Sequence, residues 1–252
     1  CSVMATHYLG ETIDIHSGGE DLVFPHHENE KAQSEALTGK PFARYWLHNG
    51  FLNIDKQKMS KSLGNFFTVR DIEKEFDPKV IRLFMLSAHY RSPLNFSREL
   101  MEAAKNALMR LENFKTMLDH MAEAVPDTQP GEDERAWARG LSKYRADFEE
   151  AMEDDINTAD ALAAIYELVR EANTYLQSAT RTRQTVEAVA ALFNSLCNVL
   201  GIAARESGGL ESEIEALIEK RQQARKDKNW AEAYRIRDDL KERGIVLEDT
   251  PQ

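Results

Sequence analysis

Two histidines and two glutamates stand together near the start of the chain, in the run HHENE (26–30). If this run is helical, His26 and Glu30 are four residues apart on one face, where an imidazole and a carboxylate can bind one metal ion. Cys1 could add a thiolate, and a set of Cys, His and Glu suits zinc. The protease pattern HExxH is absent, because Lys31 stands where its second histidine would be. The alternative is a polar helix start with two exposed histidines.

A glycine pair precedes this run, in the sequence SGGED (17–21). Glycines between a strand and a helix let the backbone approach a ligand closely, because they carry no Cβ. A carboxylate at the same turn, such as Asp21, can accept hydrogen bonds from ribose hydroxyls. Gly18, Gly19 and Asp21 are therefore candidates for a nucleotide site, although an ordinary turn has the same pattern.

A lysine-rich segment, residues 56–70, has four basic residues and no acidic one. Within it, Lys58 and Lys61 lie beside the hydroxyl groups of Ser60 and Ser62. Mobile ammonium groups with hydroxyl donors suit a polyphosphate whose charge grows in a transition state. A solvated basic loop is the other interpretation of such a segment.

A second basic segment lies near the end of the chain, where residues 220–243 contain nine Lys or Arg and five Asp or Glu. Arg225, Lys226 and Lys228 flank Trp230 there. Arginine beside an aromatic side chain suits stacking on, and phosphate contact with, unpaired nucleotides. The alternative is a charged helical hairpin with Trp230 as its core anchor.

The elements that must position the first two candidates follow a strand–turn–helix order. Residues 12–16 alternate apolar and polar, as a half-buried strand does, and glycines then break the pattern. Pro25 opens an expected helix that stops near Gly39, and residues 45–53 are a second expected strand. This order is typical of an α/β nucleotide-binding unit.

From residue 95 onward the pattern is helical. Apolar residues recur at steps of three and four between 100 and 121, a loop is expected at 126–131, and further helices follow Asn157 and Arg183. Gly201 is the expected C-cap of the last of these, and Cys197 lies on its apolar stripe as a packing residue. We expect an antiparallel helical bundle. After a linker at 208–209, two amphipathic helices (210–227 and 229–243) and a short strand (245–247) are expected.

The amino-acid composition excludes several classes of protein. The chain has 252 residues, of which 42% are hydrophobic and 30% charged, with a formal net charge of −11. This is a globular composition, and no apolar run approaches the roughly 20 residues of a membrane span. The two cysteines exclude a disulfide scaffold and fit a reducing compartment. Because the chain is acidic, contact with nucleic acid must use local patches.

Taken in order, these motifs resemble one family. KMSKS (58–62) is the signature loop of class I aminoacyl-tRNA synthetases. Several longer runs are similar to cysteinyl-tRNA synthetases: CSVM (1–4), DIHSGGEDL (14–22), FPHHENE (24–30), KMSKSLGNFFTVRD (58–71), MEDDINT (152–158) and GIVLED (244–249). The resemblance covers essentially the whole chain.

The resemblance implies ligands and partners. In the family, two cysteines, a histidine and a glutamate hold one zinc ion per active site. Three of these match Cys1, His26 and Glu30, and the fourth lies outside this chain. Further site residues follow from the resemblance: Lys61 and Lys58 on the phosphates of ATP, with Mg²⁺; His16, Gly18, Gly19 and Asp21 in the adenylate pocket; Arg225, Lys226, Lys228, Trp230 and Asp249 on cysteine tRNA.

The resemblance also implies the fold, which is α/β plus all-α in three parts. Residues 1–94 are expected to be the second half of a Rossmann-type catalytic domain, 95–208 the helical anticodon-side bundle, and 209–252 a small C-terminal α/β subdomain that binds tRNA. The expected activity is that of a cytoplasmic cysteine–tRNA ligase without membrane contact. Since the other class I motif, HIGH, is missing, we expect the chain to need the N-terminal half of the enzyme and to be inactive alone.

Two alternatives remain open at this point. One is a cysteine-activating ligase of the mycothiol type, which joins cysteine to an amino sugar and would share the first region. The other is a non-catalytic fragment that binds tRNA.

Overall fold

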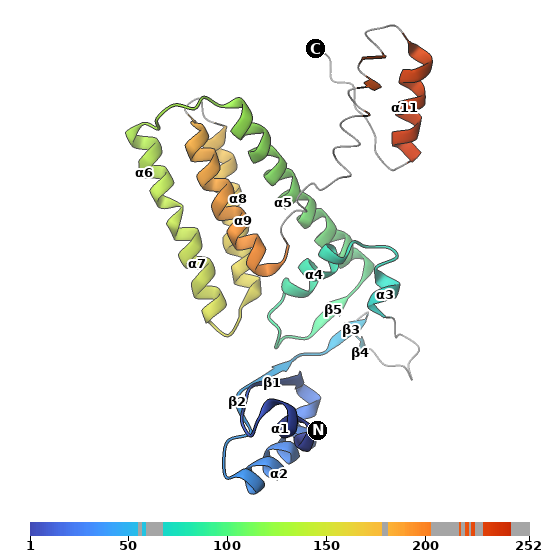
Figure 1. Cartoon of the computed structure of the whole chain (residues 1–252), viewed down its shortest axis with the longest axis vertical. Helices are drawn as coiled ribbons and strands as arrows, with labels where there is room; N and C mark the ends of the chain where they lie inside the picture. Colours follow the sequence, from blue (N-terminus) through green and yellow to red (C-terminus); the bar gives the residue numbers. More distant parts are fainter. Residues whose placement is uncertain are drawn as a thin grey trace. The chain divides into compact units, whose positions relative to one another are not determined.

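The computed structural model describes residues 1–54, 57–58, 68–177, 181–202, 217, 220–221, 223–224 and 229–242. The chain divides into two compact units, residues 1–203 and 204–252 (Figure 1). Each unit is described by itself below. No helix among these residues has both the length and the apolar surface to cross a bilayer.

The first unit begins with a small parallel sheet. Strand β1 (Ile13–Gly19) pairs with β2 (Ala43–Asn49), with Ile13 opposite Ala43 and Gly19 opposite Asn49. Two helices accompany the sheet: α1 (Ser2–Leu9) and α2 (Glu28–Thr38). The core between them is small, with Ile13, Phe42 and Ala43 buried. The expected order of strand, glycine turn, helix and strand is confirmed.

Helix α2 begins later than expected. It starts at Glu28 rather than Pro25, because residues Val23–His27 form a short π-helical segment, in which Phe24 has extended backbone angles (φ −128°, ψ 131°). The segment between β1 and α2 forms two short turns, η1 (Glu20–Leu22) and η2 (Val23–His27). The helix ends at Gly39 as expected, with a left-handed φ of 69°.

The expected strand 45–53 is two strands, with a break at Gly50. After β2 ends, β3 (Leu52–Ile54) joins a different sheet, where it pairs antiparallel with β4 (Gln57–Lys58) and parallel with β5 (Leu94–Phe96). A Cβ on Gly50 would lie 2.6 Å from the carbonyl carbon of Ser92, so only glycine fits this close backbone approach.

Two short helices lie between β4 and β5. Helix α3 (Val69–Ile72) has a capping box, in which Thr68 and Asp71 satisfy each other's backbone N–H groups. Helix α4 (Pro78–Leu86) starts with proline in its first turn and is capped by the carboxylate of Asp77, which accepts from the N–H of Lys79. Both helix starts therefore follow local sequence signals.

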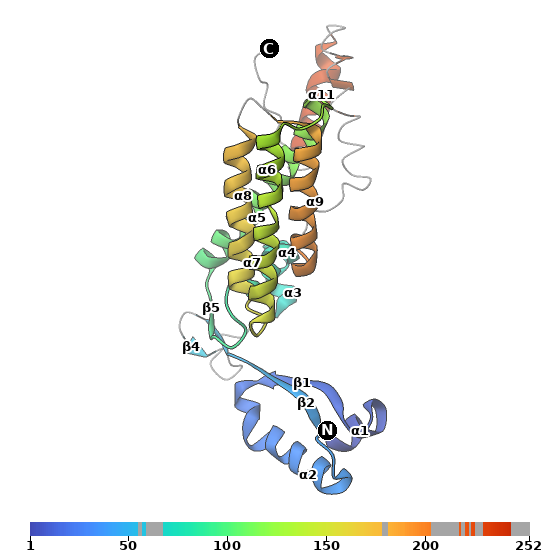
Figure 2. The same ribbon diagram turned by 90° about the vertical axis from the view of Figure 1, so that its left-hand side faces the viewer.

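The rest of the first unit is helical, and the two views show its long helices side by side (Figures 1 and 2). These helices are α5 (Arg98–Ala124), α6 (Glu132–Gly140), α7 (Ser142–Glu153), α8 (Thr158–Leu176) and α9 (Arg183–Leu200). Asn157 caps α8 through its side chain, and Gly201 ends α9 with a φ of 65°, as expected. Buried residues of these helices and of α4 form one continuous apolar core.

The described part of the second unit contains α11 (Trp230–Glu242), drawn in red in Figure 1. Ala233, Ile236 and Leu240 are buried on one side of this helix, together with Ala224. This helix confirms part of the expected segment 229–243. The expected helix 210–227 lies largely, and the expected strand 245–247 entirely, outside the described residues.

Candidate functional site

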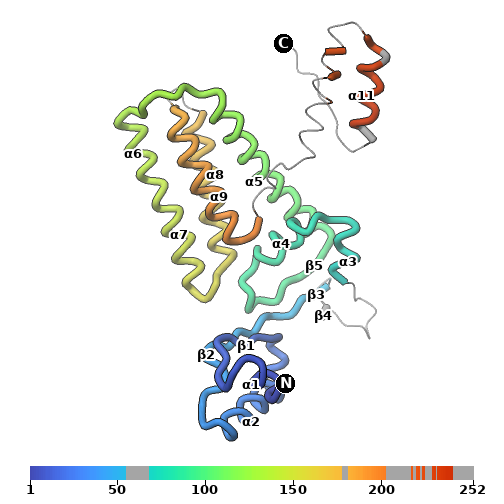
Figure 3. The backbone as a smooth tube through the Cα atoms, viewed as in Figure 1, coloured from blue at the N-terminus to red at the C-terminus, as the bar shows by residue number. Residues whose placement is uncertain are grey.

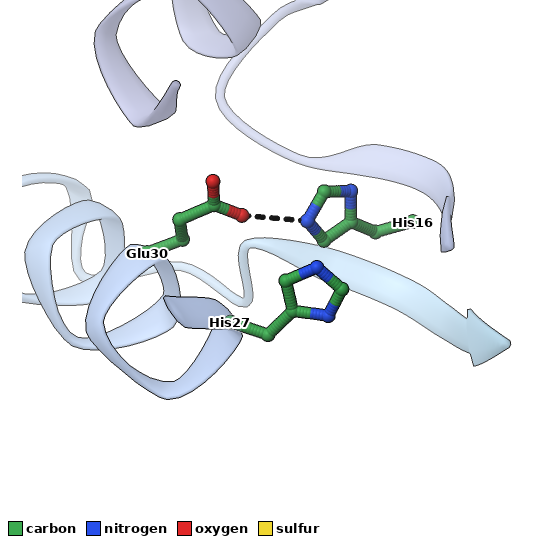
Figure 4. Close-up of side chains that lie close together, drawn as sticks. All are labelled: His16, His27 and Glu30. Atoms are coloured by element: carbon green, nitrogen blue, oxygen red, sulfur yellow. Dashed lines mark hydrogen bonds and ion pairs between the residues drawn. The ribbon is translucent and has the colours of Figure 1, made fainter. Parts of the chain in front are cut away.

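Three side chains from β1 and α2 meet beside the small parallel sheet (Figure 4). His16 comes from β1, His27 from the turn that leads into α2, and Glu30 from the first turn of α2. Gly18 makes room for this arrangement, since a Cβ there would lie 2.8 Å from Cε1 of His27. The crossover from β1 to α2 thus places all three groups together.

The cluster contains direct polar contacts. Nε2 of His16 lies 2.6 Å from Oε2 of Glu30, and Nδ1 of His27 lies 2.8 Å from Nε2 of His48. One ligand atom each from His16, His27 and Glu30 lies within 4.8 Å of the others. The group therefore brings together two imidazole nitrogens and a carboxylate oxygen, which are atom types that zinc binds.

Aromatic rings surround the imidazoles. The indole ring of Trp46 makes an edge contact with His16 at 4.8 Å between centroids and stacks parallel to His48 at 6.2 Å. Phe42, buried in the small core, makes an edge contact with His16 at 5.5 Å. These rings exclude water from one side of the cluster, which strengthens the electrostatic interactions inside it.

Burial lowers the pKa of His27 below its ordinary value, and the neighbouring imidazole of His16 adds to this effect. The negative charge of Glu30 acts in the opposite direction without reversing the result. A neutral imidazole carries one N–H and one lone pair, so His27 can either donate to or accept from His48. The cluster is thus a hydrogen-bonded polar group within an apolar surrounding.

Of the three predicted metal ligands, Glu30 alone belongs to this cluster. Cys1 and His26 are both exposed, Cys1 with a free thiol before α1 and His26 in the turn η2. Because α2 starts at Glu28, the spacing argument that put His26 and Glu30 on one continuous helix face does not apply as stated. The ligand set Cys1, His26 and Glu30 remains a prediction.

The expected nucleotide-binding residues lie at the end of β1. Gly18 and Gly19 are its last two residues, and Asp21 follows in the turn η1. A Cβ on Gly19 would lie 2.6 Å from Oδ1 of Asp21, so the absence of a side chain at Gly19 lets that carboxylate fold back over the strand end. His16, expected in the same pocket, is the residue that contacts Glu30.

Of the two lysines expected to contact phosphate, only Lys58 is among the described residues. Lys58 is the second residue of β4, where its backbone pairs with Asn53. Lys61 lies outside the described residues. Their roles stay predictions from the KMSKS motif.

Most of the expected tRNA-binding residues are also outside the described part of the chain, namely Arg225, Lys226, Lys228 and Asp249. Trp230 is the first residue of α11, and 51% of its surface is exposed. A half-exposed indole is not a fully buried core anchor, so part of Trp230 is accessible from solvent.

His27, His48 and Trp46 were not among the predicted site residues. His48 and Gly18 are opposite each other in the parallel register of β1 and β2, although they are thirty positions apart in sequence. The usable signal was the alternation along β2, which puts Trp46 and His48 on one side of the strand. Only the pairing with β1 shows which side faces the cluster.

Known proteins with similar sequences cover the whole chain. Family models match three consecutive stretches: the tRNA synthetases class I (C) catalytic domain at 1–106, the DALR domain at 147–204, and the cysteinyl-tRNA ligase anticodon binding domain at 207–252. Proteins named cysteine–tRNA ligase match all 252 residues, with 52% identity in Bacillus licheniformis, 53% in Geobacillus thermodenitrificans and 51% in Anoxybacillus flavithermus. The chain spans 54% of the length of each.

A solved structure resembles the fold at lower identity. It is the LeuRS of Agrobacterium radiobacter K84 in a ternary complex with tRNA and LeuAMS, with a TM-score of 0.60 and 19% identity. The match covers 75% of this chain and 27% of that one, and it shows a similar fold. Together with the motif series and the three family models, these findings show that the chain belongs to the cysteinyl-tRNA synthetase family.

Proposed function

We propose that the protein to which this chain contributes is a cysteine–tRNA ligase. It would activate cysteine with ATP and transfer it to the 3′ end of cysteine tRNA. The observation that carries the proposal is identity of 51–53% with named cysteine–tRNA ligases over all 252 residues, which include the KMSKS segment and the expected zinc ligands. Because the chain spans about half of those relatives, the whole reaction belongs to the longer protein.

The donor groups of Cys1, His26 and Glu30 fit a zinc ion by type. Zinc binds thiolate, imidazole and carboxylate ligands in a four-coordinate site. The thiol of Cys1 is free and His26 is exposed. Among the described residues, Oε1 of Glu30 has no partner, since the contact with His16 uses Oε2. Each of the three residues thus has a donor atom available, and we place the fourth ligand outside this chain.

The distance between His16 and Glu30 argues for a supporting role of His16. Two ligands of one tetrahedral zinc lie roughly 3.3–3.4 Å apart, as follows from metal–ligand distances of about 2.0–2.1 Å. Nε2 of His16 and Oε2 of Glu30 are 2.6 Å apart, which is a hydrogen-bond distance. We infer that His16 orients the Glu30 carboxylate, as outer-shell partners of metal ligands do.

A bound zinc ion would supply selectivity for sulfur. Zinc is a borderline-soft ion that accepts thiolate readily, whereas serine offers only a hydroxyl group and alanine offers no ligand. A purely apolar pocket separates near-isosteres by only about 10–200-fold. The role of Cys1, His26 and Glu30 is therefore to hold the group that distinguishes cysteine from serine.

The phosphate chemistry would rest on Lys61, with Lys58 beside it in the same motif. Attack of the cysteine carboxylate on the α-phosphorus of ATP forms the adenylate and releases pyrophosphate, so negative charge develops on phosphoryl oxygens. Positive groups positioned there, with Mg²⁺, lower the barrier. Gly18, Gly19, Asp21 and His16 would line the adenylate pocket at the end of β1.

The remaining residues would hold tRNA. We propose the division 1–94, 95–208 and 209–252, with an antiparallel bundle in the middle and the anticodon contact in the last part. The match of residues 207–252 to an anticodon binding domain supports this assignment, and the exposed part of Trp230 suits base stacking. Arg225, Lys226, Lys228 and Asp249 would contact the tRNA near it. An enzyme of this kind acts in the cytoplasm.

We expect the chain to be inactive without the other half of the enzyme. The described strands β1 and β2 form a two-stranded parallel sheet, and a sheet of this size is marginal without further strands. Their side chains Ile15 and Tyr45, which are opposite each other, are 62% and 67% exposed. In a Rossmann-type sheet, further strands pair along the edges and helices cover the faces, so we expect the other half of the enzyme to extend this sheet and cover these side chains.

The test uses the full-length protein and its Glu30→Gln variant. We expect cysteine-dependent ATP–pyrophosphate exchange and charging of cysteine tRNA by the wild type, with one zinc per active site. Glu30→Gln should raise the KM for cysteine more than the KM for ATP. The control is Glu28→Gln, which changes an exposed residue in the same helical turn and should leave both values unaltered.

Two results would redirect the proposal. If the protein activates cysteine but transfers it to an amino sugar rather than to tRNA, it is the mycothiol-type ligase. If it binds tRNA without activating cysteine, it is a non-catalytic tRNA-binding protein. Equal changes of both KM values in Glu30→Gln would contradict the role given to Glu30.

A further inference from the structure

The turn between α7 and α8 has an unusual backbone. Asp155 and Ile156 both have positive φ values, 55° and 58°, although neither is glycine. A left-handed backbone is disfavoured for residues with a Cβ, and most strongly for a β-branched one. Such a turn persists only where surrounding contacts stabilise it, and Asp155 makes several such contacts.

The carboxylate of Asp155 receives two donors from a distant segment. The hydroxyl of Tyr90 donates to Oδ1 at 2.8 Å, and the guanidinium of Arg91 lies 2.8 Å from Oδ2. Both donors belong to the α4–β5 connection, which we define as residues 87–93. The left-handed turn therefore directs Asp155 onto a segment more than sixty residues earlier in the chain.

The two donors are themselves held in place. Nε of Arg91 donates to the hydroxyl oxygen of Tyr90 at 3.2 Å, and the backbone N–H of Arg91 donates to Nδ1 of His89 at 3.2 Å. The imidazole of His89 stacks on Tyr90, and its Nε2 lies 3.7 Å from Oδ2 of Asp155. The hydrogen bond with Tyr90 and the charge of Asp155 raise the pKa of Arg91, so its guanidinium stays charged at all working pH values.

A second contact joins the same two regions. The hydroxyl of Thr158, at the start of α8, donates to the carbonyl of Leu86 at 2.9 Å. Thr158 is buried, and Leu86 is the last residue of α4. The α7–α8 turn is thus fastened at two points to the end of α4 and the connection that follows it, whose paths are traced in Figure 3.

The α4–β5 connection and the start of β5 also have backbone contacts with the segment that follows β2. The N–H of Gly50 donates to the carbonyl of Tyr90 at 2.8 Å, and the N–H of Leu94 donates to the carbonyl of Phe51 at 2.9 Å. Gly50 follows β2 directly, two residues after His48 of the histidine cluster. The connection therefore contacts both the α7–α8 turn of the helical bundle and the segment that follows the strand carrying His48.

We propose that Asp155 is a positioning residue that fixes the helical bundle to the catalytic part by holding the α4–β5 connection, and that this attachment is needed for transfer to tRNA more than for activation of cysteine. The second half of this inference rests on the proposed function. Its physical reason is that tRNA must contact the bundle and the active site at once, whereas cysteine and ATP contact the active site alone.

Hydrogen exchange of this chain tests the attachment without any activity. Asp155→Asn and Tyr90→Phe each remove part of the contact, and we expect the amides of Gly50 and Leu94 to exchange roughly tenfold faster in both, equivalent to about 1.4 kcal/mol. Asp154→Asn is the matched control, because it removes the same charge from an exposed neighbour. Unchanged exchange in Asp155→Asn would overturn the proposal.

The full-length protein tests the functional half. Asp155→Asn and Asp155→Gly should reduce kcat/KM for tRNA charging roughly tenfold, while cysteine-dependent ATP–pyrophosphate exchange changes less than about twofold. Asp155→Gly is decisive, because glycine adopts the left-handed backbone without steric cost, so loss of the carboxylate is not accompanied by added backbone strain. Normal charging by Asp155→Gly, or equal loss of both activities, would overturn the proposal. Absence of charging by the wild type would instead refute the proposed function. The hydrogen-exchange result on the attachment would still hold.

Discussion

The β1–β2 region and the helical bundle differ in what fills their interiors. In the first, three apolar residues are buried, and beside them lie two histidines and a glutamate. In the second, a continuous core includes Leu168 and Ile165 with no measurable exposure. The bundle is thus stabilised by its own packing, whereas the β1–β2 region carries polar chemistry where its apolar packing is thin.

This difference suggests a division of labour. A well-packed bundle resists change, and under the proposed function it would hold tRNA in a fixed place. A region with few buried apolar side chains opens more readily, as functional segments tend to do. The following predictions test whether the two regions differ in this way, beginning with the largest expected effect.

Replacing Leu168 by alanine should destabilise the chain by about 2–5 kcal/mol, because it leaves a cavity in a fully buried site of α8. Replacing Ile15 by alanine in β1 should change the free energy of unfolding by less than about 0.5 kcal/mol, because that side chain is 62% exposed. Urea denaturation followed by circular dichroism measures both. A large loss in Ile15→Ala would show that something covers this strand in solution and would weaken the comparison.

Glu134 is the buried charge of the bundle. Burial by itself raises the pKa of Glu134, but hydrogen bonds from Thr185 and Thr182 outweigh this and lower it below the ordinary 4.5. The unfolded chain therefore takes up a proton first, and stability should fall as the pH drops below about 4.5. Acid titration of unfolding measures this loss, which should be smaller in Glu134→Gln.

Glu134→Ala should lower the free energy of unfolding more than Glu134→Gln does. Oε1 of Glu134 accepts from the backbone N–H of Thr182 at 2.7 Å and from its hydroxyl at 2.9 Å. Glu134→Ala leaves the buried N–H of Thr182 without its acceptor, which costs about 1–3 kcal/mol, and leaves the Thr182 hydroxyl with Thr185 at 3.3 Å as its partner. Equal stability of the alanine and glutamine variants would mean that water replaces the carboxylate and that this end of the bundle is open.

Substitution of Gly50 by alanine tests how tightly the segment after β2 packs against the α4–β5 connection. Adding a methyl group there forces the backbone of Ser92 to move, since the new Cβ would lie 2.6 Å from its carbonyl carbon. Overpacking of this kind costs about 1–3 kcal/mol. Gly131→Ala is the control, because no heavy atom lies within 4 Å of its added Cβ. If the two variants are equally stable, the approach of Gly50 to the α4–β5 connection is loose.

The reactivity of the two cysteine thiols should show the difference between the two regions without any mutation. Burial raises the pKa of Cys197 to about 12, so at pH 8 this thiol is protonated and inaccessible. Cys1 is exposed. We expect a thiol reagent to modify one cysteine in the native chain and two after denaturation. Rapid modification of Cys197 in the native chain would indicate that α9 opens frequently.

Local signals made much of the bundle predictable. Asn157 and Gly201 have the residue types that begin and end helices, and both act as caps in the structure. Helices α6 and α7 were not predicted individually, because one follows the other after Gly140 with a single intervening residue and no proline. The break of β2 at Gly50 was not predicted either, because it depends on the backbone of Ser92, 42 residues further along the chain.

The site was less predictable than the fold. Residue types near His26 and Glu30 indicated metal chemistry, but they could not show that Glu30 contacts His16 or that His27 contacts His48. The first pair depends on the crossover from β1 to α2, and the second also depends on the pairing of β2 with β1, so no single segment encodes either. Conversely, the KMSKS motif identified a family without any described geometry, because Lys61 lies outside the described residues.

The left-handed pair in the α7–α8 turn also has a practical consequence for engineering heat resistance. Asp155 carries contacts that a substitution would remove, but Ile156 holds an equally disfavoured backbone with 44% of its surface exposed. Glycine or asparagine adopts this conformation at lower cost, so Ile156→Gly or Ile156→Asn should gain roughly 1 kcal/mol. A selection for variants that survive heating should therefore find replacements at position 156 early and retain aspartate at position 155.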